Sequence, residues 1–328
     1  MGRHHPPRHR DQEEDAGDQA RVRGEKEKDT ERNWFFEPFV PDRVSVPASG
    51  AEELAREIAW EEVATDDLAS DPRYWELAPG AAWHGFGHVA AGFAMTDPNK
   101  LTVLTPGFDR RTGEYEGYGI PAPVVAQFLR ENRVVPEKND LNSLLFLLTP
   151  GVESSKAGTL LSTLVAFKRL HDANALLEDV IPEFVRRRPA RYRGQRLREL
   201  CGEMHDFYRE AGTNALQRAQ FAPAHLPEMA LPPYEAVRQL VRNKVDYLPI
   251  DQIAGRIATT LFVIYPPGIA TIVPGERLGK RAQPMLDYLK VFERSANRFP
   301  GFEAEIQGLF RGIDADGTIR FYTYVMRE

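Results

Sequence analysis

The sequence predicts an α/β region followed by an α+β region, both behind an N-terminal segment that stays unfolded. Three observations support this prediction. The first 33 residues are dense in charge, short apolar runs alternate with helical periods from Trp34 onward, and the sequence becomes basic and helix-rich after about Asn174. A chain of 328 residues is long enough for two domains with buried cores.

The N-terminal segment lacks the material for a core. Residues 1–33 hold 8 Lys or Arg and 9 Asp or Glu, but only four aliphatic or methionine side chains. So few apolar groups cannot offset the conformational entropy lost on ordering. We therefore predict a disordered charged tail, in which His4, His5 and His9 are incidental rather than a metal site.

Two strands and two helices are expected in the first folded region. The strands are residues 101–105 and 144–148, and the helices are residues 122–132 and 154–170. Pro121 suits the start of the first helix, and Ser154 or Ser155 can cap the second. Residues 144–148 are apolar on both faces, which predicts a central strand in a covered sheet.

The second region mixes both kinds of element. We expect helices over residues 197–208 and 284–299 and strands over residues 245–250, 257–264 and 318–326. The Asp316-Gly317 dipeptide marks a turn before the last strand.

Composition excludes several classes of protein. Hydrophobic residues are 42% and charged residues 27%, as in soluble globular proteins, and no apolar run approaches the length of a membrane span. The net charge of −6 offers no general attraction for nucleic acid. A single cysteine, Cys201, excludes an internal disulfide framework and a multi-cysteine metal site. The N-terminus lacks a signal-like apolar core, so we expect a cytoplasmic protein.

The motifs that could carry chemistry each have a structural alternative. His84 and His88 lie four residues apart beside Trp83, but the glycines between them favour a packed loop over a metal-binding helix. The segment Tyr265–Ile269 is either a rigid bend between strands, which we favour, or the wall of a pocket. Glu137, between a helix and a strand, is by itself more typical of a solvated loop acid than of a ligand site. No complete catalytic constellation is present.

Several short motifs together resemble one enzyme family, the bacterial ornithine/lysine/arginine decarboxylases, which depend on pyridoxal phosphate (PLP) and have the aspartate-aminotransferase fold. The motifs occur in family order from about residue 33 to the C-terminus. They are Trp34-Phe35-Phe36, Trp83-His84-Gly85-Phe86, Leu104-Thr105-Pro106-Gly107, Gly119-Ile120-Pro121-Ala122, Glu137-Lys138, Gly255-Arg256-Ile257-Ala258, Tyr265-Pro266-Pro267-Gly268-Ile269 and Phe299-Pro300-Gly301-Phe302-Glu303.

The resemblance implies a particular division of the chain and an incomplete site. It assigns residues 34–174 to a small aminotransferase-like α/β domain and residues 175–328 to the family's C-terminal α+β domain. The family joins PLP to a lysine in a Ser-x-His-Lys motif, and this sequence has no His-Lys dipeptide. The chain therefore resembles the C-terminal half of such an enzyme, with no catalytic residue of its own and no activity expected in isolation.

The resemblance also implies a substrate-binding role for particular residues. An acid at the position of Glu137 is associated in the family with the distal amino group of the substrate, because a carboxylate is the natural partner of an ammonium. This favours lysine or ornithine over arginine as substrate. Five further residues are candidates for the rim of the pocket: Trp83, His84, Tyr265, Pro267 and Gly268.

Two functional hypotheses from different classes follow. In the first, the chain is the substrate-recognition part of a PLP-dependent decarboxylase that forms a diamine or polyamine and CO2, acting as a homo-oligomer or with a chain that carries the PLP domain. In the second, it is a non-catalytic fragment that docks onto a full-length decarboxylase. The missing domain leads us to expect an exposed apolar face on residues 34–174.

Overall fold

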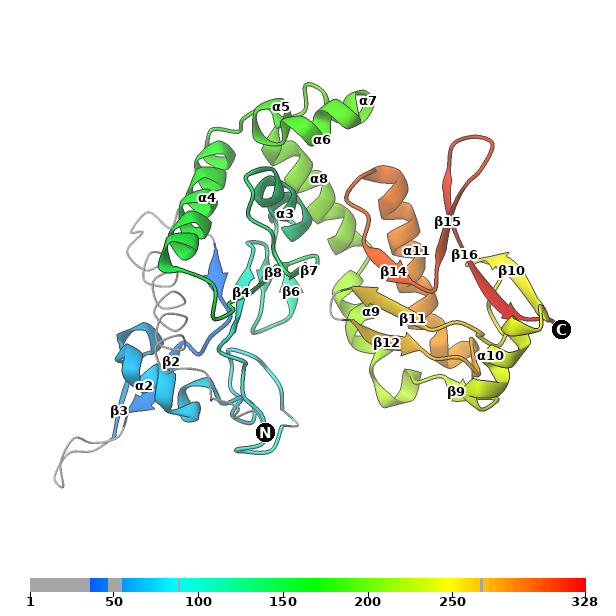
Figure 1. Cartoon of the computed structure of the whole chain (residues 1–328), viewed down its shortest axis with the longest axis horizontal. Coiled ribbons are helices and arrows are strands. Elements are labelled where there is room, and N and C mark those ends of the chain that lie inside the picture. Colours follow the sequence, from blue (N-terminus) through cyan, green and yellow to red (C-terminus); the bar gives the residue numbers. More distant parts are fainter. Residues whose placement is uncertain (1–35, 47–54, 88, 266–267) are drawn as a thin grey trace, which may run out of the picture. The chain divides into compact units, whose positions relative to one another are not determined.

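The computed structural model describes residues 36–46, 55–87, 89–265 and 268–328 (Figure 1). The predicted tail, residues 1–33, lies outside the described residues, as do Trp34, His88, Pro266 and Pro267. The mixture of helices and strands is confirmed, in two compact units. None of the described helices is long and apolar enough to cross a membrane.

The two units divide later in the chain than our boundary near Asn174. The first unit runs to Arg186 and includes Arg193–Gly202, and the second comprises Arg187–Tyr192 and Glu203–Glu328. Glu131 shows why residues just after 174 stay with the first unit, because its carboxylate accepts hydrogen bonds from the backbone N–H groups of Glu183 and Phe184 (3.0 and 2.8 Å). The division into family domains at residues 174 and 175 stays a prediction.

The first unit is built around a four-stranded sheet in the order β1-β4-β8-β7. Its strands are β1 (Glu37–Pro38), β4 (Lys100–Leu104), β7 (Lys138–Asn139) and β8 (Ser143–Leu147). The predicted strands at 101–105 and 144–148 are thus confirmed to within a residue, as is the helix α3 (Ala122–Glu131), and α4 (Ser154–Asp172) is confirmed but ends two residues later than predicted. The helix α3 packs against α4, β7 and β8.

The pairing of this sheet differs from the alternating α/β arrangement that we expected. All three strand pairs are antiparallel, and burial along β8 alternates, with Leu144 and Phe146 buried and Leu147 exposed. A run of apolar residues therefore did not mark a strand covered on both faces. The antiparallel pairing of β7 with β8 follows from the turn between them. There the Asp140 carboxylate accepts hydrogen bonds from the N–H groups of Asn142 and Ser143 (2.7 and 2.5 Å) and closes a hairpin.

The predicted serine cap of α4 is also corrected. Glu153 is the N-cap residue and makes no side-chain capping bond. Ser155 lies inside the first turn, where its hydroxyl contacts the Glu153 carboxylate at 3.4 Å.

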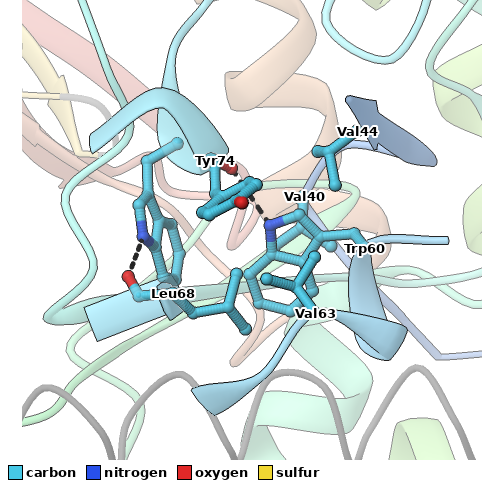
Figure 2. Close-up of a cluster of buried hydrophobic side chains, with 7 residues drawn as sticks. Val40, Val44, Trp60, Val63, Leu68 and Tyr74 are labelled. Carbon is cyan, nitrogen blue, oxygen red and sulfur yellow. Dashed lines mark hydrogen bonds between the residues drawn. The ribbon is translucent and has the colours of Figure 1, made fainter. Parts of the chain in front are cut away.

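A second small core in the first unit has no counterpart in the sequence predictions. It is formed by β2 (Arg43–Val46), β3 (Arg56–Ala59), α2 (Thr65–Ser70) and two 3-10 helices, Trp60–Glu62 and Pro72–Trp75. Trp60 and Trp75 pack edge to face, with ring centroids 5.2 Å apart. Figure 2 shows the Trp60 indole N–H donating to the Tyr74 carbonyl (3.0 Å) and a second indole, that of Trp75, donating to Leu68 (2.7 Å).

The remaining elements of the first unit are short. The strands β5 (Phe108–Asp109) and β6 (Glu114–Tyr115) form a hairpin. The helices α5 (Leu177–Val180) and α6 (Pro182–Arg187) follow α4. The helix α7 (Pro189–Tyr192) belongs to the second unit, and the longer helix α8 (Leu197–Glu210), which confirms the helix predicted at 197–208, is divided between the two units after Gly202.

The second unit contains small antiparallel sheets and three helices of eight or more residues within the described ranges. The helices are α9 (Thr213–Gln220), α10 (Pro233–Val241) and α11 (Gln283–Arg298). The strands are β9 (Glu228–Met229), β10 (Val245–Pro249), β11 (Phe262–Tyr265), β12 (Ile269–Ile272), β13 (Glu276–Arg277), β14 (Glu305–Gln307), β15 (Phe310–Ile313) and β16 (Ile319–Met326). They pair in the orders β10-β16-β15, β12-β11-β14 and β13-β9.

Most predictions for the second unit are confirmed, and one is corrected. The predicted helix at 284–299 and the strands at 245–250 and 318–326 are α11, β10 and β16. The strand predicted over 257–264 is broken, because Ile257 and Ala258 form isolated bridges to Arg277 and Val325, and β11 begins only at Phe262. The turn before β16 is confirmed by Gly317, whose φ is +85° and whose N–H bonds to the Asp314 carbonyl.

Candidate functional site

Glu137 lies at the edge of the sheet in the first unit, directly before β7. Its backbone N–H donates to the Leu145 carbonyl (2.8 Å), which aligns the residue with β8. Two residues further on, the Asn139 side chain accepts a hydrogen bond from Arg130 of α3 (2.9 Å). The backbone that carries Glu137 is therefore held on two sides.

The Glu137 carboxylate itself is open to solvent. Its side chain is exposed and makes no hydrogen bond or ion pair with the described residues. The buried residue Pro136 precedes it. An exposed carboxylate attracts an ammonium only weakly, so tight binding at Glu137 requires another surface that covers it.

Trp83 and His84 form a packed loop, as the structural alternative predicts. Trp83 contacts the rings of Phe39 and His84, with centroids 5.1 and 4.7 Å away. The His84 Nδ1 atom accepts a hydrogen bond from the Phe86 N–H (2.9 Å). Burial lowers the pKa of His84, and the Ala78 carbonyl opposes that effect. A neutral, internally bonded histidine is thus a structural member of this loop.

Tyr265 and Gly268 flank the connection between β11 and β12 in the second unit. Gly268 has a φ of +80°, and its N–H donates to the Ile264 carbonyl (3.0 Å). A Cβ atom at this position would lie 2.9 Å from the Tyr265 ring, so glycine is required for both the backbone angle and the space. The strands β11 and β12 pair antiparallel, and Pro267, the third candidate here, lies outside the described residues.

The structure therefore brings together only part of the predicted set. Trp83 and His84 are in contact, and Glu137 belongs to the same unit without a described contact to either. Tyr265 and Gly268 belong to the second unit. The assignment of these residues to one pocket stays a prediction.

Sequence reasoning missed a polar cluster around the buried side chain of His171 in the first unit. The Tyr118 hydroxyl and His171 Nε2 are hydrogen-bonded at 2.8 Å, and the Arg198 guanidinium donates to the His171 carbonyl (2.8 Å). Burial lowers the pKa of His171 to about 4, and the charge of Arg198 acts in the same direction. No local pattern could have revealed the pair, because Tyr118 and His171 are 53 residues apart.

The residues that the structure describes do not fit PLP. That cofactor needs a lysine for its aldehyde and a carboxylate for its ring nitrogen. Lys168 is paired with Asp172 on its own helix (2.7 Å). Lys156 lines a cavity, but its ammonium donates to the Gly151 carbonyl (3.0 Å) and no acidic residue lines that cavity. The described residues also contain no group of three or more His, Cys, Asp or Glu side chains able to hold a metal.

Comparison with known proteins identifies two matched regions. Residues 11–156 match the family described as Orn/Lys/Arg decarboxylase, major domain, and residues 214–327 match Orn/Lys/Arg decarboxylase, C-terminal domain. The first match begins inside the segment that we predicted to be a tail, so most of that segment lies within the family match.

Individual relatives agree with this match. The constitutive ornithine decarboxylase of Escherichia coli (strain K12) is 40% identical over 293 residues, which are 89% of this chain and 39% of that protein. Lysine decarboxylase LdcA of Pseudomonas aeruginosa is 38% identical over 277 residues, which are 84% of this chain and 34% of that protein.

Solved structures show the same relationship. Lysine decarboxylase A from Pseudomonas aeruginosa superposes with a TM-score of 0.80 at 34% identity, over 97% of this chain and 39% of that one. The constitutive lysine decarboxylase of E. coli gives a TM-score of 0.79 at 30% identity, over 97% of this chain and 40% of that one. The chain thus spans about two fifths of the length of these relatives, and it belongs to the Orn/Lys/Arg decarboxylase family.

Proposed function

We propose that this chain is the substrate-recognition part of a basic amino-acid decarboxylase. The observation that carries the proposal is the family match, which extends over nine tenths of the chain in its ornithine decarboxylase relative. Relatives of this chain are named as ornithine, lysine and arginine decarboxylases, so the substrate class is a basic amino acid.

Glu137 is the residue that we assign to the substrate. Its carboxylate has no partner among the described residues, and its backbone is held by β8 and α3. A positioned acid without a partner suits a terminal ammonium, and its attraction strengthens when a covering domain excludes water. We favour lysine or ornithine over arginine, because an ammonium needs only a nearby negative charge, whereas a guanidinium is held best by a carboxylate fixed in a bidentate orientation.

The cofactor and its lysine belong, in this proposal, to another part of the assembly. The family is PLP-dependent, and PLP supplies the electron sink for loss of CO2 when it is bound. Because the described residues do not fit PLP, we assign its binding to a domain or a partner chain with a Schiff-base lysine. Homo-oligomer formation is part of the same proposal.

The exposed apolar side chains of the first unit support the proposal that another domain or chain covers this unit. Several large hydrophobic side chains between residues 86 and 147 are exposed, as expected for a domain that another domain covers. They are Phe86, Phe93, Met95, Tyr118, Val135 and Leu147.

The purified chain should be inert with PLP alone. Incubation with PLP and then borohydride should leave no reduced adduct at a single lysine, and lysine or ornithine should release no CO2, because no described lysine sits in a suitable site. Mass spectrometry and labelled CO2 capture measure the two results. One stoichiometric adduct together with CO2 release would contradict the proposal.

Substitution of Glu137 by glutamine should weaken substrate binding once activity is restored. In a chimera that joins the preceding part of the E. coli ornithine decarboxylase to this chain, we expect the KM for ornithine or lysine to rise about 10-fold or more, which is the effect of losing a charge-assisted hydrogen bond. Glu62→Gln, at an exposed position of the same unit, is the matched control and should leave kinetics unchanged.

The result separates the two functional hypotheses. An active chimera with unchanged kinetics for Glu137→Gln would refute the role of Glu137. A folded chimera without activity, with the isolated chain binding a full-length decarboxylase, would favour a docking fragment.

A further inference from the structure

The first unit contains a cavity whose rim includes Val135 and Leu147, two of the exposed apolar side chains named above, and whose charged groups have no role in the proposed decarboxylase function. Its volume is about 270 Å³, and it opens among β4, β8, the N-terminal turns of α4 and the loop after α3. Leu101, Phe146 and Leu160 form buried parts of its wall. The lining is therefore mostly apolar, as in sites for small organic ligands.

The charged groups of this cavity are both cationic. Arg133 and Lys156 line it, and no aspartate or glutamate does. Within the described part of the chain, the Arg133 guanidinium makes no hydrogen bond or ion pair. The Lys156 ammonium contacts only a backbone carbonyl, that of Gly151 (3.0 Å). A cation without a protein carboxylate leaves room for an anionic ligand.

The backbone of Arg133 is unusual for its residue type. Arg133 follows α3 with a φ of +64°, its N–H bonds to the Arg130 carbonyl, and the next N–H, of Val134, bonds to Leu129. This is the Schellman motif, whose left-handed position is normally glycine or asparagine. A long side chain there strains the backbone.

Two other helices end in the same motif and show what the position ordinarily holds. Asn174 follows α4 with a φ of +47°, and Asn243 follows α10 with a φ of +55°. The same pair of backbone bonds closes each of them: Asn174 to His171 with Ala175 to Leu170, and Asn243 to Leu240 with Lys244 to Gln239. Only the motif that borders the cavity carries an arginine, at the expense of backbone strain that asparagine largely avoids.

We propose that this cavity binds a small aliphatic carboxylate, with its chain against Leu101, Phe146 and Leu160 and its carboxylate at Arg133 and Lys156. The sign of the charge separates it from the site proposed at Glu137. A basic substrate or a diamine product would bring an ammonium to two cations, which repel it. Glu137 itself lies two residues beyond Val135, outside the cavity lining.

Two probes with the same apolar chain and opposite charge test the ligand class. Isothermal titration calorimetry with the full chain should show octanoate binding at least 10-fold more tightly than octylamine. Equal binding of the two, or no binding of octanoate, would overturn the proposal. Neither result bears on Glu137, so this test can fail while the proposed function stands.

Variants at Arg133 test whether its guanidinium holds the carboxylate, because octanoate binding and thermal stability should change in opposite directions. Arg133→Gly should weaken octanoate binding about 10-fold or more and raise the melting temperature of the ligand-free chain by a few degrees, since glycine adopts a positive φ without strain. Arg133→Lys keeps the charge and should retain most of the binding.

Asn243→Gly is the matched control, because it changes the same backbone position in the second unit. It should leave octanoate binding unchanged. Binding that is equally tight in the folded Arg133→Gly chain would show that the guanidinium does not hold the ligand, and would overturn the proposal.

Discussion

Replacing Trp60 by alanine should lower the free energy of unfolding of the first unit by about 3–5 kcal/mol, the usual range for removing a buried tryptophan. Trp60 is fully buried among the side chains of Figure 2. It packs edge to face on Trp75. Its indole N–H also satisfies the Tyr74 carbonyl, which would be left unpaired. The cluster is small, so the neighbouring residues Val40, Val63 and Leu68 can fill little of the cavity.

One further variant separates packing from hydrogen bonding at Trp60, and another is a control at the surface. Trp60→Phe keeps most of the ring but loses the N–H, and should be destabilised by about 1–3 kcal/mol. Phe93→Ala removes an aromatic ring that is 81% exposed and should change stability by no more than about 0.5 kcal/mol.

Tryptophan fluorescence in a denaturant titration measures this prediction selectively. The four tryptophans all lie between residues 34 and 83, so the signal reports on the first unit and not on the second. Trp75 and Trp83 remain as reporters in the variants. A midpoint for Trp60→Ala that coincides with that of Phe93→Ala would show that this cluster is not a stabilising core.

Acid should destabilise the first unit through His171. The pKa of this side chain is about 4 in the folded protein against 6.5 ordinarily, mainly because it is buried. Above pH 6.5 the imidazole is neutral in both states and has no effect. As the pH falls from 6.5 to about 4, the unfolded chain takes up a proton that the folded chain resists, so stability falls by about 3 kcal/mol and then levels off.

His171→Gln isolates this contribution. Glutamine does not titrate and can still hydrogen-bond to the Tyr118 hydroxyl. We expect the variant to be less stable than the wild type at pH 7 and to lose less stability on acidification, so that the two curves converge by about 3 kcal/mol between pH 6.5 and 4. Parallel curves, measured by the same fluorescence titration, would contradict a buried neutral His171.

Tyr118→Phe tests which cause of the low pKa dominates. Because burial is the leading cause, removing the hydroxyl partner should leave most of the pH dependence in place. NMR titration of the imidazole reports the same pKa directly.

Features of the fold and of the candidate site could be predicted where they depend on a residue's local sequence. Pro121 before α3 and the Asp316-Gly317 turn were recognised because proline and glycine restrict their own backbone angles. At the candidate site, the exposure of Glu137 agrees with the solvated loop acid that its local sequence indicates. The contact of Tyr118 with His171 was not predicted, because it joins segments distant in sequence. Arg133 escaped notice because its residue type is unfavourable for the conformation that it adopts.

The sequence by itself determined the positions of most helices and strands and the family resemblance, because apolar periodicity, turn residues and ordered motifs are local properties. Tertiary structure decided the rest. Strand partners such as Lys100 and Leu147 are joined antiparallel across 47 residues, and that pairing sets which face of β8 is buried. Folding also brings Arg133 and Lys156 to the lining of one cavity. Pairing, burial and charge neighbours are properties of contacts between distant residues, so they arise only when the chain folds.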